Sequence, residues 1–239
     1  MDDAGNSYVV TGFNSLQSLS PDGDLRWTYK NDDPNVTLTS DPSINLNNEI
    51  LIAESTNKLL YVDANGKIKS SFDLGAQAQF PAVTSLDGTV YVCAKNMFYS
   101  LSKDGNLNWK KDIENHFLSG YLALTADGDI VAPFTSNGVE KVFKINGSNG
   151  DYAYVWGGTK SAVIAQNELA FFMKNEFLFG TDTKKDVGEN VLWNARVGKN
   201  NENEVTWMEA PVVSTAGTVY AMADGLTDTI QGPLIAVIN

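Results

Sequence analysis

Side chains that could hold a hard metal ion gather in the short Asp-Gly and Asn-Gly segments of the chain, at residues 22–24, 63–66, 127–129 and 146–151. Loop carboxylates and carbonyls bind Ca²⁺, but a dedicated loop needs a spaced ligand series that ends on a bidentate Glu. None of the four segments carries that series. Asp and Asn also favour tight turns, because they tolerate a left-handed backbone. We therefore expect turns here, with incidental calcium binding as the alternative.

Nucleophilic and acid–base chemistry has few candidate residues. His116 is the only histidine, which excludes zinc sites built from several histidines. A Ser-His-Asp triad would have to use His116, and no serine stands in a nucleophile-elbow motif. Cys93 is the only cysteine, so no internal disulfide can form, and its apolar surroundings predict a buried thiol. The sequence thus predicts no catalytic, cofactor-binding or metal-binding residue, and an enzyme is the less favoured interpretation.

A pattern of four short strands recurs at intervals of about 40 residues, which is typical of propeller blades. The third copy has strands at residues 80–83, 89–92 and 98–101 and a fourth that contains Trp109. The strands are rich in β-branched and aromatic residues, and no helical periodicity is sustained. Such a unit cannot bury both faces alone, whereas repetition around an axis packs each sheet on its neighbours. We expect one all-β propeller domain, residues 1–239, with six blades at about 5–32, 38–75, 79–113, 118–157, 159–198 and 208–239.

The first and last copies of the repeat are incomplete. The first copy opens at its second strand, residues 7–10, and the last stops after its third strand, residues 234–237. The missing strands belong to different blades, so they do not complement each other. This pattern favours a propeller segment of a larger protein over a closed ring.

The charge of the chain bears on its partners. Seventeen basic and 29 acidic residues give a formal net charge of −12. Such a surface repels phosphate backbones and anionic lipid, so nucleic acid and direct membrane insertion are poor expectations. Residues 1–10 lack the basic and apolar regions of a signal peptide, which fits either a cytosolic protein or a mature or trimmed form.

Residues 87–109, DGTVYVCAKNMFYSLSKDGNLNW, resemble the PQQ-like repeat, the propeller repeat of quinoprotein alcohol dehydrogenases and their non-enzymatic relatives; residues 21–27, PDGDLRW, resemble the same element. The likeness extends over essentially the whole chain. It implies that the repeat tryptophan of each blade docks against the neighbouring blade. The matching residues are Trp27, Trp109, Trp156 and Trp193, with Phe72 in the second copy. The family's Ala-x-Asp before the turn is only partly present.

The resemblance allows several functions, since members include calcium-dependent quinone dehydrogenases, periplasmic scaffolds and sensor domains. A quinone enzyme usually has eight blades and often a vicinal disulfide, which Cys93 alone cannot supply. We therefore favour a non-catalytic binding or scaffold module for a protein or polysaccharide, located in the periplasm, at the cell surface or in the medium, with a cytoplasmic location left open. The alternatives are a quinoprotein or saccharide-acting enzyme, and a structural spacer. Trp207 lies outside the repeat register, which makes it a candidate partner contact.

Overall fold

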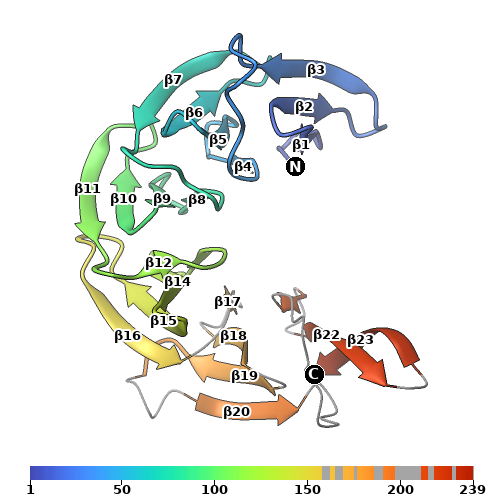
Figure 1. Ribbon diagram of the computed structural model, residues 1–239, viewed down its shortest axis with the longest axis vertical. Helices are drawn as coiled ribbons and strands as arrows, with labels where there is room; N and C mark the ends of the chain where they lie inside the picture. Colours follow the sequence, from blue (N-terminus) through green and yellow to red (C-terminus); the bar gives the residue numbers. More distant parts are fainter. Residues whose placement is uncertain are drawn as a thin grey trace. The chain divides into compact units, whose positions relative to one another are not determined.

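A computed structural model describes residues 1–157, 162–164, 169–174, 177–185, 191–196, 211–214, 218–227 and 230–238 (Figure 1). The chain divides into two compact units, unit 1 at Met1–Asn115 and unit 2 at His116–Asn239. The described elements are all β-strands, and among the described residues no helix is long and apolar enough to cross a membrane.

Unit 1 contains three antiparallel sheets whose strands follow one another in chain order. We number them sheet 1 (β1–β3), sheet 2 (β4–β7) and sheet 3 (β8–β11). Their strands are β1 Ser7–Thr11, β2 Ser15–Leu19, β3 Leu25–Lys30, β4 Ser43–Ile44, β5 Ile50–Glu54, β6 Lys58–Val62, β7 Ile68–Asp73, β8 Val83–Thr84, β9 Val90–Ala94, β10 Met97–Leu101 and β11 Leu107–Asp112. Figure 1 shows the last strands of the sheets, β3, β7 and β11, along one side of this unit, and the first strands on the other side. We call β3, β7 and β11 fourth strands, because β1–β3 correspond to the second, third and fourth strands of a complete copy.

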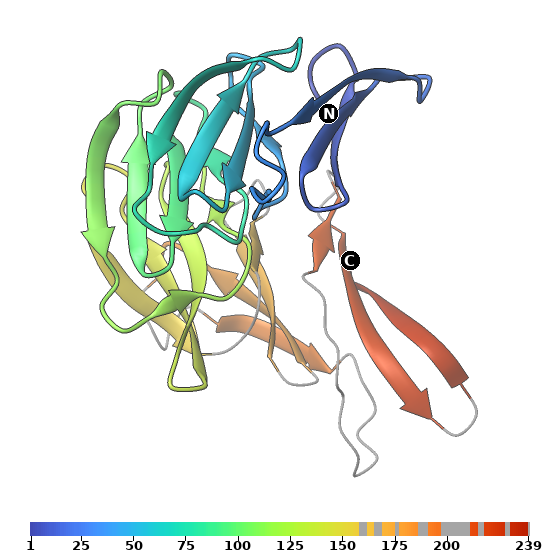
Figure 2. The same ribbon diagram turned by 45° about the horizontal axis from the view of Figure 1, so that its top comes forward.

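The described residues of unit 2 form three more sheets of the same kind: sheet 4 (β12–β16), sheet 5 (β17–β20) and sheet 6 (β21–β23). Figure 2 shows β22 and β23 of sheet 6 as a long two-stranded ribbon. The strands are β12 Phe117–Leu118, β13 Ala123–Leu124, β14 Ile130–Ser136, β15 Val139–Ile145, β16 Tyr152–Gly157, β17 Ala162–Ile164, β18 Leu169–Lys174, β19 Phe177–Asp182, β20 Val191–Arg196, β21 Val212–Val213, β22 Val219–Thr227 and β23 Ile230–Ile238.

The predicted all-β fold of small repeated sheets is confirmed, and so are the incomplete end copies. Sheets 1 and 6 have three strands each among the described residues, whereas sheets 2, 3 and 5 have four. Two details differ from the expectation. Sheet 4 has an additional short strand, β12, which pairs with β14 beyond β13, where β14 extends two residues beyond the length of β5 and β9. The first strand of most sheets is only two residues long.

In sheets 1 to 5, a register shift recurs between the last two strands, which are the third and fourth strands of the repeat. It lies between Ser18 and Leu19 in sheet 1 and between Tyr61 and Val62 in sheet 2. The same irregularity occurs at Ser100/Leu101, Val142/Phe143 and Gly180/Thr181. Because a bulge of this kind re-aims the side chains beside it, these shifts fix which residue of the fourth strand faces the neighbouring sheet.

The apolar core of unit 1 lies in two seams between consecutive sheets. The first seam joins Tyr8, Val10, Leu16 and Trp27 of sheet 1 to Ile50, Ile52, Leu60 and Val62 of sheet 2. The second joins Leu51, Leu59 and Tyr61 of sheet 2 to Val90, Val92, Tyr99 and Leu101 of sheet 3. Sheets 4 and 5 share a seam of the same type in unit 2. Within each unit, the sheets joined by these three seams bury apolar faces against one another, as the repeat pattern predicts.

Candidate functional site

One end of unit 1 is built from a repeated five-residue turn. The turn joins first to second strands at residues 45–49 and 85–89, leads into β1 at residues 2–6, and precedes the last strand of each sheet at residues 20–24, 63–67 and 102–106. Adjacent antiparallel strands reverse direction, so both kinds of turn lie at the same end of their sheet. We call this end, formed by these six segments, the turn face.

All six turns close with the same two backbone hydrogen bonds. The amide of the first residue donates to the carbonyl of the fifth, and the amide of the fourth donates to the carbonyl of the first. The fourth residue has positive φ in each turn, at Gly5, Gly23, Asn48, Gly66, Gly88 and Gly105. Gly and Asn adopt this conformation with the least strain, which explains why Gly or Asn stands at the fourth position of every turn.

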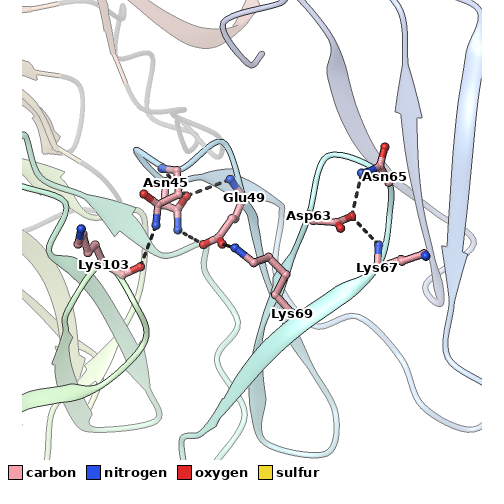
Figure 3. Close-up of polar contacts among 8 residues, drawn as sticks. Asn45, Glu49, Asp63, Asn65, Lys67, Lys69 and Lys103 are labelled. Atoms are coloured by element: carbon pink, nitrogen blue, oxygen red, sulfur yellow. Dashed lines mark hydrogen bonds and ion pairs between the residues drawn. The ribbon is translucent and has the colours of Figure 1, made fainter.

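The carboxylates of Asp63 and Asp87 accept hydrogen bonds from their own turns. One Asp63 oxygen accepts hydrogen bonds from the amides of Asn65 (2.8 Å) and Lys67 (2.9 Å), as Figure 3 shows. The hydrogen bond from the Lys67 amide is the main reason why the pKa of Asp63 is lowered. The Ser85 hydroxyl and the Thr89 amide donate to Asp87 and likewise lower its pKa.

Side-chain oxygens in the turns of unit 2 are likewise engaged by neighbouring amides and a lysine. Asp129 accepts a hydrogen bond from the Gly147 amide and pairs with Lys144 at 3.2 Å. Asn146 accepts from the amides of Ser148 and Asn149. Over the part of the chain that the structure describes, no group of three or more His, Cys, Asp or Glu side chains could hold a metal ion.

A buried polar cluster lies beneath the turn face in sheet 2. Asn45 and Glu49 are almost fully buried, and the Asn45 amide donates to the Glu49 carboxylate at 2.8 Å (Figure 3). Lys69 of β7 forms an ion pair with the same carboxylate. Burial acts to raise the pKa of Glu49, but the hydrogen bonds from Lys69 and Asn45 outweigh it, so the pKa is lowered overall. The cluster fixes the 45–49 turn against the fourth strand.

Polar contacts also join the turns of successive sheets. Asn48 donates to the carboxylate of Asp3 at 3.1 Å, and Asn47 donates to the carbonyl of Lys103 at 3.4 Å. The first contact joins sheet 1 to sheet 2, and the second joins sheet 2 to sheet 3. The turn face is therefore a connected surface within unit 1.

Two leucines stand exposed on this surface. Leu46 and Leu86 occupy the second position of equivalent turns, and their side chains are 59% and 89% exposed. Leu46 reaches toward the neighbouring turn, since its Cδ1 lies 3.8 Å from where a Cβ on Gly88 would be. Sequence reasoning missed both residues. The signal was present as a leucine between a turn-initiating Asn or Ser and the following Asn or Asp, where a polar residue is usual.

Three of the repeat tryptophans occupy one position of the strand register. Trp27, Trp109 and Trp193 pair with the last residue before the bulge, namely Ser18, Ser100 and Gly180. Trp156 also pairs with the residue before a bulge, Val142, but in sheet 4 this bulge lies two residues nearer the start of the third strand. In sheet 2 the register places Ser70 at this position, opposite Tyr61, while Phe72 lies two residues farther along and pairs with Leu59. Phe72 therefore differs in position from Trp27, Trp109 and Trp193 and corresponds to Trp156, and its ring contacts that of Tyr99 in sheet 3.

Trp27 contacts the next sheet through its ring and its N–H. The indole Nε1–H donates to the carbonyl of Ala64 at 2.8 Å. The ring lies over Gly66 so closely that a Cβ there would meet it at 2.8 Å. Trp109 and Trp193 contact second-strand rings of their own sheets, Tyr91 and Phe171. Trp207 lies outside the described residues.

The remaining candidates for chemistry are His116 and Cys93. His116 is half-buried, with its ring edge-on to Phe143 (centroids 5.0 Å apart) and a nitrogen 3.4 Å from the Lys141 ammonium. Cys93 is buried, and burial raises the pKa of its thiol to about 12. The thiol is therefore protonated at neutral pH, in the state that is poorly reactive.

Comparison with known proteins shows the fold. No family model matches the sequence, and no curated protein matches it. A streptogramin B lyase structure is similar with a TM-score of 0.70 at 16% identity, over 92% of this chain and 73% of that one. The Pan2 WD40 domain of Neurospora crassa has a TM-score of 0.63 at 16% identity, over 89% and 68% of the two chains. BamB from Moraxella catarrhalis has a TM-score of 0.52 at 16% identity, over 93% and 70%. At these identities the likeness confirms a propeller-type fold alone.

Proposed function

We propose that this chain is a non-catalytic binding module of the PQQ-like repeat type, which engages a protein partner through the turn face of unit 1. The observation that carries the proposal is the pair of exposed leucines, Leu46 and Leu86, on equivalent turns of adjacent sheets. An exposed leucine alone is ordinary, but two at matched positions on one connected surface are the kind of feature found at interaction sites.

The rigidity of the turns supports this assignment. Each leucine sits in a turn closed by backbone hydrogen bonds, and Asn45 and Ser85 lie beneath with buried side chains. Binding through such residues orders little additional chain, so little of the contact energy is lost to conformational entropy. Exposed polar groups surround the leucines, including Asn47 and Lys103, which matches an apolar centre with a polar rim.

The chemistry of the surface favours a protein over other partners. Its exposed apolar residues are aliphatic, and the chain carries a net charge of −12. Aliphatic contacts suit the apolar side chains of a protein, whereas polyanions are repelled by the acidic surface. An extracytoplasmic location, expected from the family resemblance, is part of this proposal.

The test is capture followed by matched substitution. We expect the intact protein to retain a specific partner, identified by mass spectrometry, and the double variant Leu46→Asp/Leu86→Asp to weaken binding by about 30-fold or more, the effect of a hot spot of roughly 2 kcal/mol. The control is Phe13→Asn, which removes an 80% exposed ring from a positive-φ position in the β1–β2 hairpin, away from the turn face.

Two results would contradict the proposal. If Phe13→Asn abolishes capture and the leucine variant does not, the turn face is the wrong surface. If no protein partner is retained while the chain binds a polysaccharide on a glycan array, or turns over a saccharide or an alcohol, the functional class itself is wrong.

A further inference from the structure

One polar cluster in sheet 2 brings together an amine, a carboxylate and a primary amide. The Lys69 ammonium pairs with Oε1 of Glu49, and the Asn45 side-chain amide donates to Oε2 of the same carboxylate at 2.8 Å (Figure 3). Asn45 is 4% exposed and Glu49 is 6% exposed, whereas the Lys69 side chain is 55% exposed. A single carboxylate therefore holds a nucleophile, the Lys69 amine, beside an electrophile, the side-chain carbonyl carbon of Asn45.

The Asn45 side-chain carbonyl is held as an acyl-transfer reaction requires. Its Oδ1 accepts hydrogen bonds from two backbone amides, those of Asn47 at 2.9 Å and Glu49 at 3.0 Å. Two such donors polarise the carbonyl and stabilise the negative charge that develops on its oxygen during nucleophilic attack. The same hydrogen bonds fix the position of Cγ, so the amine is the group that must move. The flexible, half-exposed stem of Lys69 allows this movement.

The combination of these three side chains is a feature of sheet 2 within unit 1. The equivalent positions are the first and fifth residues of the turn and the second residue of the fourth strand. They carry Asp2, Asn6 and Arg26 in sheet 1, and Ser85, Thr89 and Asn108 in sheet 3. All three turns close with the same backbone hydrogen bonds, so the turn itself does not require the side chains found in sheet 2.

We propose that Lys69 and Asn45 react to form an isopeptide bond, with Glu49 as the group that transfers the protons. Glu49 takes a proton from the Lys69 ammonium, and the freed electron pair of Nζ attacks Cγ of Asn45. Glu49 then gives this proton to Nδ2 and takes a second proton from the attacking nitrogen, as the Cγ–Nδ2 bond breaks and ammonia leaves. The second proton leaves with the ammonia as ammonium. The products are one amide between the two side chains and one ammonium ion, and no other reactant is consumed.

The charges around the cluster determine how the rate depends on pH. The hydrogen bond to Glu49 raises the pKa of Lys69, and Asp63 and Asp104 raise it further. Burial acts to raise the pKa of Glu49, but the hydrogen bonds that it accepts lower it overall; the Tyr61 hydroxyl is a further titratable group within its field. The ion pair therefore keeps one protonation state across the neutral range. Because the proton moves within the pair, the rate should be level between about pH 6 and about pH 9.

The test is the loss of one ammonia from the intact mass of the folded chain during prolonged incubation, followed by digestion with trypsin. We expect a branched peptide that joins residues 31–58 to residues 68–95, because trypsin does not cut after an acylated lysine. Glu49→Gln keeps the shape of the side chain and cannot take up the proton, so it should slow the loss by about 100-fold or more. Lys69→Arg should abolish the loss, because the guanidinium stays protonated.

The matched control is Lys67→Arg, which changes an exposed lysine of the preceding turn and should leave the rate unchanged. Circular dichroism checks that each variant is folded. An intact mass that stays constant at every pH would overturn the inference and show that the cluster is an ion pair only. Conversion of Asn45 to Asp would show that water, and not Lys69, is the nucleophile. A rate that rises about tenfold per pH unit over the neutral range would show that hydroxide, and not Glu49, removes the proton.

Discussion

The two seams of unit 1 fill the same place with different residues. At the first seam, Trp27 of β3 in sheet 1 covers Gly66 of sheet 2. Gly66 is the fourth residue of the 63–67 turn, which joins β6 to β7. At the second seam the equivalent glycine, Gly105, is covered by Tyr61, which lies on the third strand of sheet 2. A Cβ on Gly66 would lie 2.8 Å from the indole, and one on Gly105 would lie 3.3 Å from the phenol ring.

The difference shows that the repeat conserves an occupied volume rather than a sequence position. Tyr61 and Ser70 are cross-strand partners, and so are Ser18 and Trp27. One member of each pair is large and the other small. Cross-strand neighbours on one face have Cβ atoms about 5 Å apart, so either can project a ring over the same point of the neighbouring sheet.

Removal of the ring at each seam has the largest expected effect. Tyr61 is fully buried, so Tyr61→Ala should lower the free energy of unfolding by about 3–5 kcal/mol. Trp27 is half-buried, so Trp27→Ala should cost less. Urea unfolding followed by circular dichroism measures both. A larger loss of stability from Trp27→Ala than from Tyr61→Ala would contradict this order and show that the first seam contributes more to stability.

An added methyl group at the covered glycines comes next. Gly66→Ala combines positive φ with a clash against the indole, and we expect a loss of roughly 2–3 kcal/mol. Gly105→Ala should cost less, because its contact is looser. The matched control is Gly23→Ala, which has φ of 90° but nothing within 4 Å, so only backbone strain of about 1 kcal/mol remains. Equal losses at all three positions would contradict the close approach of the rings.

The ion pair between Glu49 and Lys69 in sheet 2 should make the free energy of unfolding depend on pH. Because the pKa of Glu49 is lowered in the folded chain, its carboxylate stabilises the fold above its ordinary pKa of about 4.3, and this contribution is lost as pH falls through the folded value. Glu49→Gln should therefore lower stability at pH 7, by about 1–2 kcal/mol for one charged hydrogen bond, and the gap to wild type should shrink below about pH 4. A gap independent of pH between 3 and 7 would exclude this role.

Removal of the polar atoms of the Trp27 and Tyr61 rings should change the free energy of unfolding least. Trp27→Phe removes the hydrogen bond to Ala64, for which we expect a loss of about 1 kcal/mol beyond the change in ring size. The Tyr61 hydroxyl is buried and has no hydrogen-bond partner among the residues that the structure describes, so Tyr61→Phe should leave stability unchanged or slightly higher. Thermal unfolding of the two variants compares them directly. A loss from Tyr61→Phe as large as that from Trp27→Phe would show that the hydroxyl is satisfied.

The repeat itself was predictable from sequence, because turn glycines and short β-branched runs recur in the order that the sheets follow. Trp27, which the resemblance placed at the docking position, donates its indole N–H to the Ala64 carbonyl of sheet 2. The exchange of roles between Tyr61 and Ser70 was not predictable, since the residue spacing along one strand does not reveal its cross-strand partner. Phe72 matched the expected spacing and not the expected position. The exposure of Leu46 and Leu86 was missed, although both leucines stand at a turn position where a polar residue is usual.

The central claim is that an aromatic ring from either strand of a cross-strand pair holds one sheet on the next. A double-mutant cycle of Tyr61→Ser and Ser70→Trp tests it, because the double variant gives sheet 2 the arrangement of sheet 1. We predict that each single variant is destabilised and that the double variant recovers at least roughly 1 kcal/mol over their sum. Additive losses, with no recovery in the double variant, would contradict the claim.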